Sequence, residues 1–134
     1  MTAEVDLPAR RSALTGWDAV RLPLLLALGL LLGLWGALLV PAGPRVGSTV
    51  LSVGAALAVV GNPLAARVGL RSVPRFGGAA VLAGWCAVAL AVSVHRSNGS
   101  VVLPGSGDLA VPALVYVVGG LAAGALAALF RTGR

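Results

Sequence analysis

The stretch Arg67-Val-Gly-Leu-Arg-Ser-Val-Pro-Arg75 separates two long apolar runs of the sequence. It carries three arginines and no acidic residue. Positively charged segments resist transfer across a bilayer, so a short basic segment between apolar runs is typical of a cytoplasmic loop in a membrane protein. The threading of the whole chain can be predicted outward from this loop.

The composition is that of a protein that resides in lipid. Of the 134 residues, 58% are hydrophobic and 10% are charged, whereas a soluble domain has about 25% charged residues. The net charge is +6, but the arginines lie at the ends of apolar runs, which indicates topology signals and not a nucleic-acid surface. All ten basic residues are arginine, and alanine, glycine, valine and leucine dominate, as expected from a GC-rich genome. We therefore expect a bacterial plasma membrane protein.

Four uncharged runs are each long enough to cross a hydrocarbon core of about 30 Å as a helix. The sequence thus predicts an all-α membrane protein with four transmembrane helices in an up-down bundle. Before them lies a polar tail, 1–21, whose end, Trp17 to Arg21, is predicted to lie along the membrane surface. The predicted spans within the transmembrane domain 22–130 are about 22–40, 46–66, 76–94 and 109–130, followed by a tail at 131–134.

The distribution of arginines predicts that both termini are cytoplasmic. In this threading only Arg45 and Arg96 lie outside, and the opposite threading would invert the ratio. The eight arginines on the inner side would be Arg10, Arg11, Arg21, Arg67, Arg71, Arg75, Arg131 and Arg134.

Two stripes of small residues predict close helix packing. Gly29, Gly33 and Gly36 recur along one side of the first span, and Gly120 and Gly124 do so in the fourth. Small residues at this spacing let the backbones of neighbouring membrane helices approach each other.

The spans contain two unusual polar or bulky features, Asn62-Pro63 and Trp85. Proline removes a helical hydrogen bond, and the carbonyl freed near residue 59 is expected to bond to the Asn62 amide or to water. Trp85 lies far from the interfacial belt, so its indole N–H is expected to find a partner across a helix contact. Tyr116 is expected near the outer surface.

The longest connection, His95 to Asp108, is predicted to be an outer loop. Its charged residues are His95, Arg96 and Asp108, which could form a polar binding site. The alternative is an exposed ion pair between Arg96 and Asp108, which would contribute about 0–1 kcal/mol.

The chemical inventory argues against catalysis. The predicted spans contain no Asp, Glu, Lys, Arg or His, so the coupling group of a proton-driven transporter is lacking. One histidine, one cysteine (Cys86) and four acids cannot supply a nucleophile with its base and orienting group. We expect no enzyme activity, no cofactor and no metal site.

Two functions remain compatible with this sequence. The first is a small structural or accessory subunit that packs, through its glycine and alanine stripes, against copies of itself or a larger membrane complex. The alternative is an oligomeric channel or carrier for an uncharged or small solute, with Ser48, Ser52, Asn62 and Ser93 facing a shared path.

The overall plan resembles the small four-span membrane proteins of actinobacteria that form families of unknown function. The shared features are the glycine-rich first span, Gly61-Asn62-Pro63, the pair Gly84-Trp85, and an outer loop from Arg96 to Asp108. The resemblance implies a bacterial membrane protein and no particular mechanism.

Overall fold

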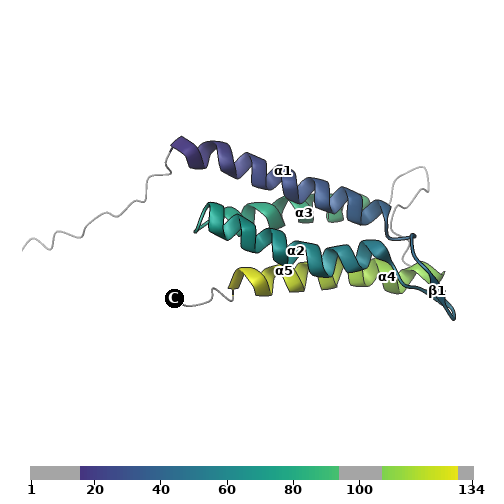
Figure 1. The fold of residues 1–134 in the computed structure, drawn as a ribbon. Coiled ribbons are helices and arrows are strands. Elements are labelled where there is room, and N and C mark those ends of the chain that lie inside the picture. The colour runs from purple at the N-terminus through teal and green to yellow at the C-terminus, as the bar shows by residue number, and fades with distance from the viewer. Residues whose placement is uncertain (1–15, 94–106, 130–134) are drawn as a thin grey trace, which may run out of the picture.

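The computed structural model describes residues 16–93 and 107–129. In these ranges the chain forms a packed bundle of four helices, and consecutive helices run in opposite directions (Figure 1). The predicted all-α bundle of four helices is therefore confirmed. The first three helices are α1 (Gly16–Leu38), α2 (Val53–Ser72) and α3 (Gly77–Ser93). The fourth consists of a 3-10 turn (Gly107–Leu109), α4 (Ala110–Leu114), a π-helical turn (Val115–Gly119) and α5 (Gly120–Leu129).

Helix α1 begins before the predicted span. The segment Trp17–Arg21, expected to lie along the membrane surface as the end of a tail, forms the first turns of this helix. Asp18 lies in the first turn, where a negative charge is favourable at the helix N-terminus. Residues 1–15 and 130–134, which contain the rest of the predicted tails, lie outside the described residues.

The start of α2 differs from the predicted span 46–66. Strands β1 (Arg45–Val46) and β2 (Thr49–Val50) form a small antiparallel hairpin, in which Arg45 is opposite Val50. Gly47 has a φ of 64° in the turn, a conformation that glycine adopts without strain. The helix begins only after Ser52, whose Oγ accepts a hydrogen bond of 3.1 Å from the N–H of Ala55.

The basic stretch 67–75, which we predicted to be a loop, is helical as far as Ser72. Helix α2 continues through Arg67 and Arg71 to Ser72, so the connection to α3 is a short turn. The helix ends there because Val73 precedes a proline and is extended, with φ −135° and ψ 94°. The guanidinium of Arg21 in α1 donates to the carbonyl of Ser72 at 3.3 Å. This contact ties the first helix to the end of the second.

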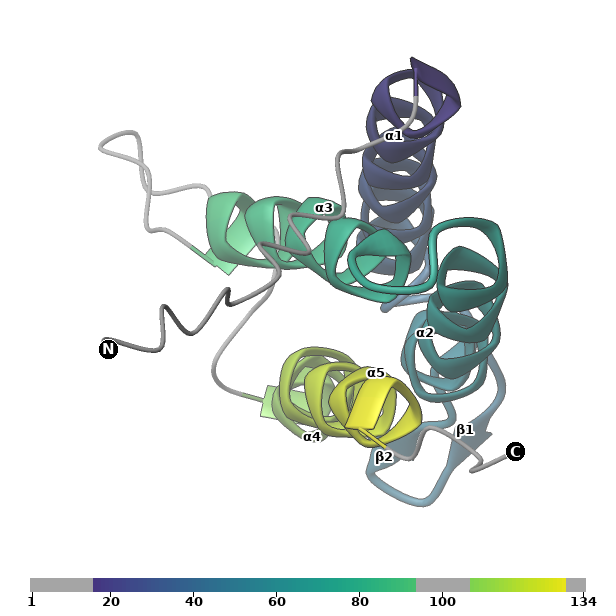
Figure 2. The same cartoon turned by 90° about the vertical axis from the view of Figure 1, so that its left-hand side faces the viewer.

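Helix α2 lies against α1, α3 and α5, as the end-on view shows (Figure 2). Helix α1 also packs against α3. In two of the contacting pairs, α1 with α3 and α2 with α5, the helices run in the same direction. Their backbones approach closely where glycines face the neighbouring helix. A Cβ at Gly29 would collide with the carbonyl of Val81 in α3, and one at Gly120 would lie 2.9 Å from Cβ of Ala58 in α2.

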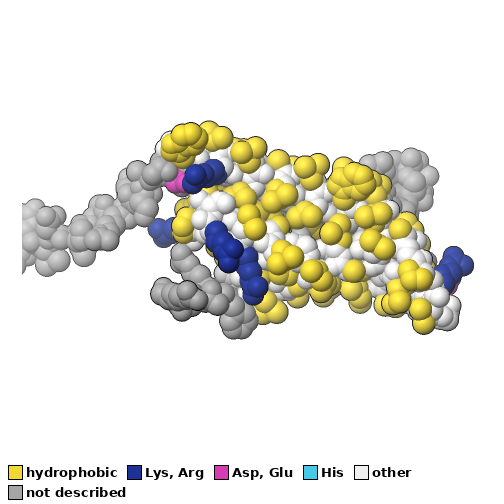
Figure 3. All heavy atoms as spheres, viewed as in Figure 1, with side chains coloured by type: hydrophobic (Ala, Val, Ile, Leu, Met, Phe, Trp, Pro, Cys, Tyr) yellow, Lys and Arg dark blue, Asp and Glu magenta, His cyan; other side chains and the backbone are white. Residues whose placement is uncertain are grey.

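The distribution of side chains is the reverse of that in a water-soluble bundle. The buried residues of α1 are three glycines, one alanine and Leu25, whereas most of its other leucines are exposed. On the face shown in Figure 3, hydrophobic side chains spread along the length of the molecule and the arginines lie toward its two ends. An apolar surface of this extent would be costly in water, at about 25 cal/mol per Å².

Three helices are long and apolar enough to cross a membrane: Gly16–Leu38, Val53–Ser72 and Gly107–Leu129. Helix α3 is apolar but has 17 residues. At a rise of 1.5 Å per residue it extends about 26 Å, somewhat less than a hydrocarbon core of about 30 Å.

Candidate functional site

Trp85 of α3 lies at the centre of the bundle, and its side chain is 1% exposed. Its ring packs against that of Tyr116, with the centroids 5.3 Å apart and the planes tilted by 48°. This separation is within the range of favourable aromatic pairs. Gly120 leaves room for the indole, since a Cβ there would lie 2.7 Å from Cζ2 of Trp85.

The indole nitrogen of Trp85 is buried and has no hydrogen-bond partner within residues 16–93 and 107–129. We expected a partner for this N–H across a helix contact, and the residues that the structure describes do not provide one. A buried donor without a partner costs about 1–3 kcal/mol, which the aromatic contact and the burial of the large ring have to offset.

Tyr116 is completely buried inside the bundle. Its expected position near the outer surface of the membrane remains a prediction. Its hydroxyl donates to the carbonyl of Gly33 in α1 at 2.6 Å. The residue lies in the π-helical turn, where the extra residue changes the direction in which the following side chains point. Its ring covers Gly36, where a Cβ would lie 2.7 Å from Cε2. The feature of the sequence that could have indicated this contact is the glycine stripe of α1, which the ring covers at Gly36.

Asn62 is also buried, and its amide nitrogen donates to the carbonyl of Gly120 at 3.3 Å. We expected this amide to bond to the carbonyl freed by Pro63. It bonds instead to the fourth helix. Helix α2 continues past Pro63 to Ser72. The asparagine thus links two helices that run in the same direction.

The five glycines predicted to mediate helix packing all lie at contacts within the chain. Gly29 and Gly33 face α3, and Gly36 faces Tyr116. Gly120 faces Trp85 and Ala58, and a Cβ at Gly124 would collide with the side chain of Leu82. Because these surfaces are occupied by the chain's own helices, they are not available to a partner protein.

The residues predicted to line a solute path are placed as follows. Ser52 and Asn62 are buried, and each is engaged in a hydrogen bond within the bundle. The hydroxyl of Ser93 donates to the carbonyl of Ala89 in its own helix at 2.6 Å. Ser48 is exposed in the hairpin turn. Two of the four residues, Ser52 and Asn62, are therefore buried inside the bundle and not exposed on its surface.

The outer-loop constellation cannot be assembled from the described residues. His95 and Arg96 lie outside them, whereas Asp108 is exposed in the 3-10 turn before α4. The proposed ion pair and the alternative binding site remain predictions. No group of three or more possible metal ligands occurs among residues 16–93 and 107–129, and Cys86 is a free thiol.

One helix face with small side chains is left uncovered by the described residues. In α3, an exposed alanine recurs at every fourth position, which places the four residues on one ridge of the helix. Leu90 is the large hydrophobic residue that α3 exposes, whereas α1 exposes many leucines. We call this surface the alanine face; it consists of Ala79, Ala83, Ala87 and Ala91.

Two exposed tryptophans mark the ends of α1. Trp17 and Trp35 are 72% and 60% exposed. Along a helix their positions are separated by about 27 Å, close to the thickness of a hydrocarbon core. Tryptophan is enriched at both membrane interfaces, so this spacing is that of a helix that crosses the bilayer.

No family model, curated protein or solved structure matches this chain. The resemblance to small four-span actinobacterial proteins therefore remains a prediction. The class of protein follows from the fold itself. With an apolar exterior, a glycine-lined interior and three helices of membrane-crossing length, the chain is a helical integral membrane protein.

Proposed function

We propose that this protein is a small membrane subunit that docks through the alanine face of α3 onto another transmembrane helix. That helix belongs to a second copy of the chain or to a larger membrane complex. The observation that carries the proposal is the exposed ridge of Ala79, Ala83, Ala87 and Ala91. Lipid tails are as apolar as leucine, so association in a bilayer depends on close packing, which small residues permit.

The length of α3 also supports docking through the alanine face. This helix is the shortest of the four, and about 26 Å of helix leaves a mismatch with a hydrocarbon core of about 30 Å. Covering the helix with protein reduces the contact between its ends and the lipid. The glycine stripes of the first and fourth helices give no such surface, because they are buried inside the bundle.

The proposed orientation places the end with Arg21, Arg67, Arg71 and Arg75 in the cytoplasm of a bacterial cell, by the positive-inside rule. Arg45 then lies on the outer side. The alternative function, an oligomeric channel or carrier, has less support, because Ser52 and Asn62 are buried and bonded within the chain.

The proposal is tested by purifying a tagged copy from its native membrane in a mild detergent and identifying what accompanies it. We expect a defined homo-oligomer or a stoichiometric larger membrane protein. Ala83→Leu places a protruding side chain on the alanine face and should abolish this association, because close packing is lost. Ala83 is exposed, so the variant should melt at the same temperature as the wild type.

Ala122→Leu is the matched control, because Ala122 is exposed on α5, where leucines already face outward. This variant should retain the partner. Recovery of a lone monomer from the wild type, or equal association of wild type and Ala83→Leu, would contradict the proposal.

A further inference from the structure

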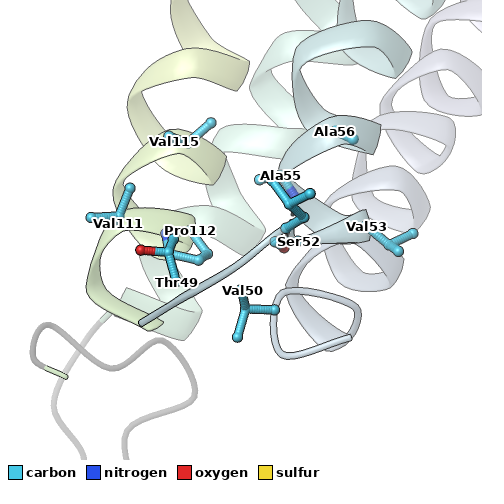
Figure 4. A pocket seen from close by; sticks show the side chains of 10 residues that line it. Thr49, Val50, Ser52, Val53, Ala55, Ala56, Val111, Pro112 and Val115 are labelled. Atoms are coloured by element: carbon cyan, nitrogen blue, oxygen red, sulfur yellow. Dashed lines mark hydrogen bonds between the residues drawn. The ribbon is translucent and has the colours of Figure 1, made fainter. Parts of the chain in front are cut away.

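A groove of about 420 Å³ lies where β2 and the start of α2 face α4. One wall includes Val50, Ser52 and Ala56, and the other includes Val111, Pro112 and Val115 (Figure 4). This volume lies within the range of roughly 300–1,000 Å³ that is usual for small-molecule sites. One wall of the groove includes the strand Thr49–Val50 and the extended residue Ser52, where the sequence predicted helix.

The groove is suited to hydrocarbon. Its lining is apolar, apart from Thr49 and Ser52, and the Ser52 hydroxyl already caps α2. Val53, Val111 and Val115 beside it are exposed on the side of the bundle. In a membrane protein such a surface faces lipid, so the groove is open to an acyl chain from the bilayer.

Two opposite charges lie on the elements that adjoin the β2 side of the groove. Arg45 lies directly opposite Val50 in the hairpin, and Asp108 lies in the 3-10 turn that packs against β2. Among residues 16–93 and 107–129, the other charged side chains are on α1 or in the segment 67–75 at the opposite end. Arginine binds phosphate through charge-assisted hydrogen bonds, and a carboxylate attracts an ammonium group.

We infer that the groove binds one acyl chain of a phospholipid with a zwitterionic, primary-amine headgroup. Arg45 binds the phosphate, Asp108 faces the ammonium group, and the chain lies between β2 and α4. This site is separate from the alanine face of α3, so it does not depend on the proposed docking function.

Native mass spectrometry of the full chain in detergent, with phosphatidylethanolamine or phosphatidylglycerol added, tests the inference. We expect one phosphatidylethanolamine to be retained per chain, in preference to phosphatidylglycerol. Arg45→Gln removes the phosphate contact and should weaken retention by about tenfold. Asp108→Asn should remove the preference for the amine headgroup. Arg71→Gln, at the opposite end, is the control and should leave retention unchanged.

A second measurement does not depend on variants. Phosphatidylethanolamine with a diazirine in the part of an acyl chain nearest the glycerol should label peptides that contain residues 49–56 and 111–115 of the wild-type protein. Labelling elsewhere, stronger retention of phosphatidylglycerol, or equal losses for Arg45→Gln and Arg71→Gln would overturn the site.

Discussion

At the scale of the residue, the centre of the bundle depends on a few side chains that cross between helices. Tyr116 belongs to the fourth helix, yet its hydroxyl bonds to the backbone of α1 and its ring packs on Trp85 of α3. Asn62 connects α2 to the same fourth helix through the carbonyl of Gly120. The sequence indicated Asn62 and Trp85 as unusual residues inside the membrane. It did not indicate their partners, because these depend on how the helices rotate against one another.

The bond from Tyr116 to Gly33 predicts the effect of Tyr116→Phe. This variant keeps the ring and removes the hydroxyl, so the free energy of unfolding should fall by about 0.5–1.5 kcal/mol, as for other hydrogen bonds between membrane helices. This free energy is measured by adding sodium dodecyl sulfate to the protein in a mild detergent until it unfolds. Ser72→Ala is the control, since its exposed hydroxyl bonds only to Val68 in its own helix. A Tyr116→Phe variant as stable as the wild type would show that the bond is unimportant.

At the scale of the element, the sequence predicted four apolar helices but not the limits of α2. Hydropathy alone extended the second span to residue 46, whereas the hairpin with Gly47 and the cap by Ser52 delay the helix to Val53. At the other end, charge suggested a loop from Arg67, but arginine is a good helix former and the helix ends only before Val73-Pro74. The π-helical turn that contains Tyr116 has no signal in hydropathy or charge.

The contact between the fourth helix and its neighbours predicts the effect of Gly120→Ala. The added methyl would lie 2.7 Å from Cζ2 of Trp85 and 2.9 Å from Cβ of Ala58. Overpacking of this kind costs about 1–3 kcal/mol, so the variant should unfold more readily in the same assay. Gly61→Ala in α2 is the matched control, because the added methyl would meet its nearest neighbour, Leu57, at 3.4 Å. This control should be neutral or slightly stabilising. Equal effects at the two positions would contradict the packing at Gly120.

At the scale of the whole molecule, the bundle buries its glycines and presents leucine and valine to the membrane, except along α3. The sequence predicted partners from the glycine stripes, and the structure instead places those stripes at contacts inside the chain. The small-residue surface that the described helices leave uncovered consists of alanines, whose exposure could not be known before the helices were packed. The central claim of our account is that this alanine face touches another protein in the membrane.

Site-directed photo-crosslinking in native membranes tests this claim most directly. In a Cys86→Ala background, Ala83→Cys and Ala122→Cys each place one thiol on an exposed position, where a benzophenone maleimide can be attached. After illumination, the label at position 83 should yield a discrete product, either a dimer or a conjugate with a larger membrane protein. The label at position 122 should react mainly with lipid. No protein product from position 83, or the same products from both positions, would contradict the account.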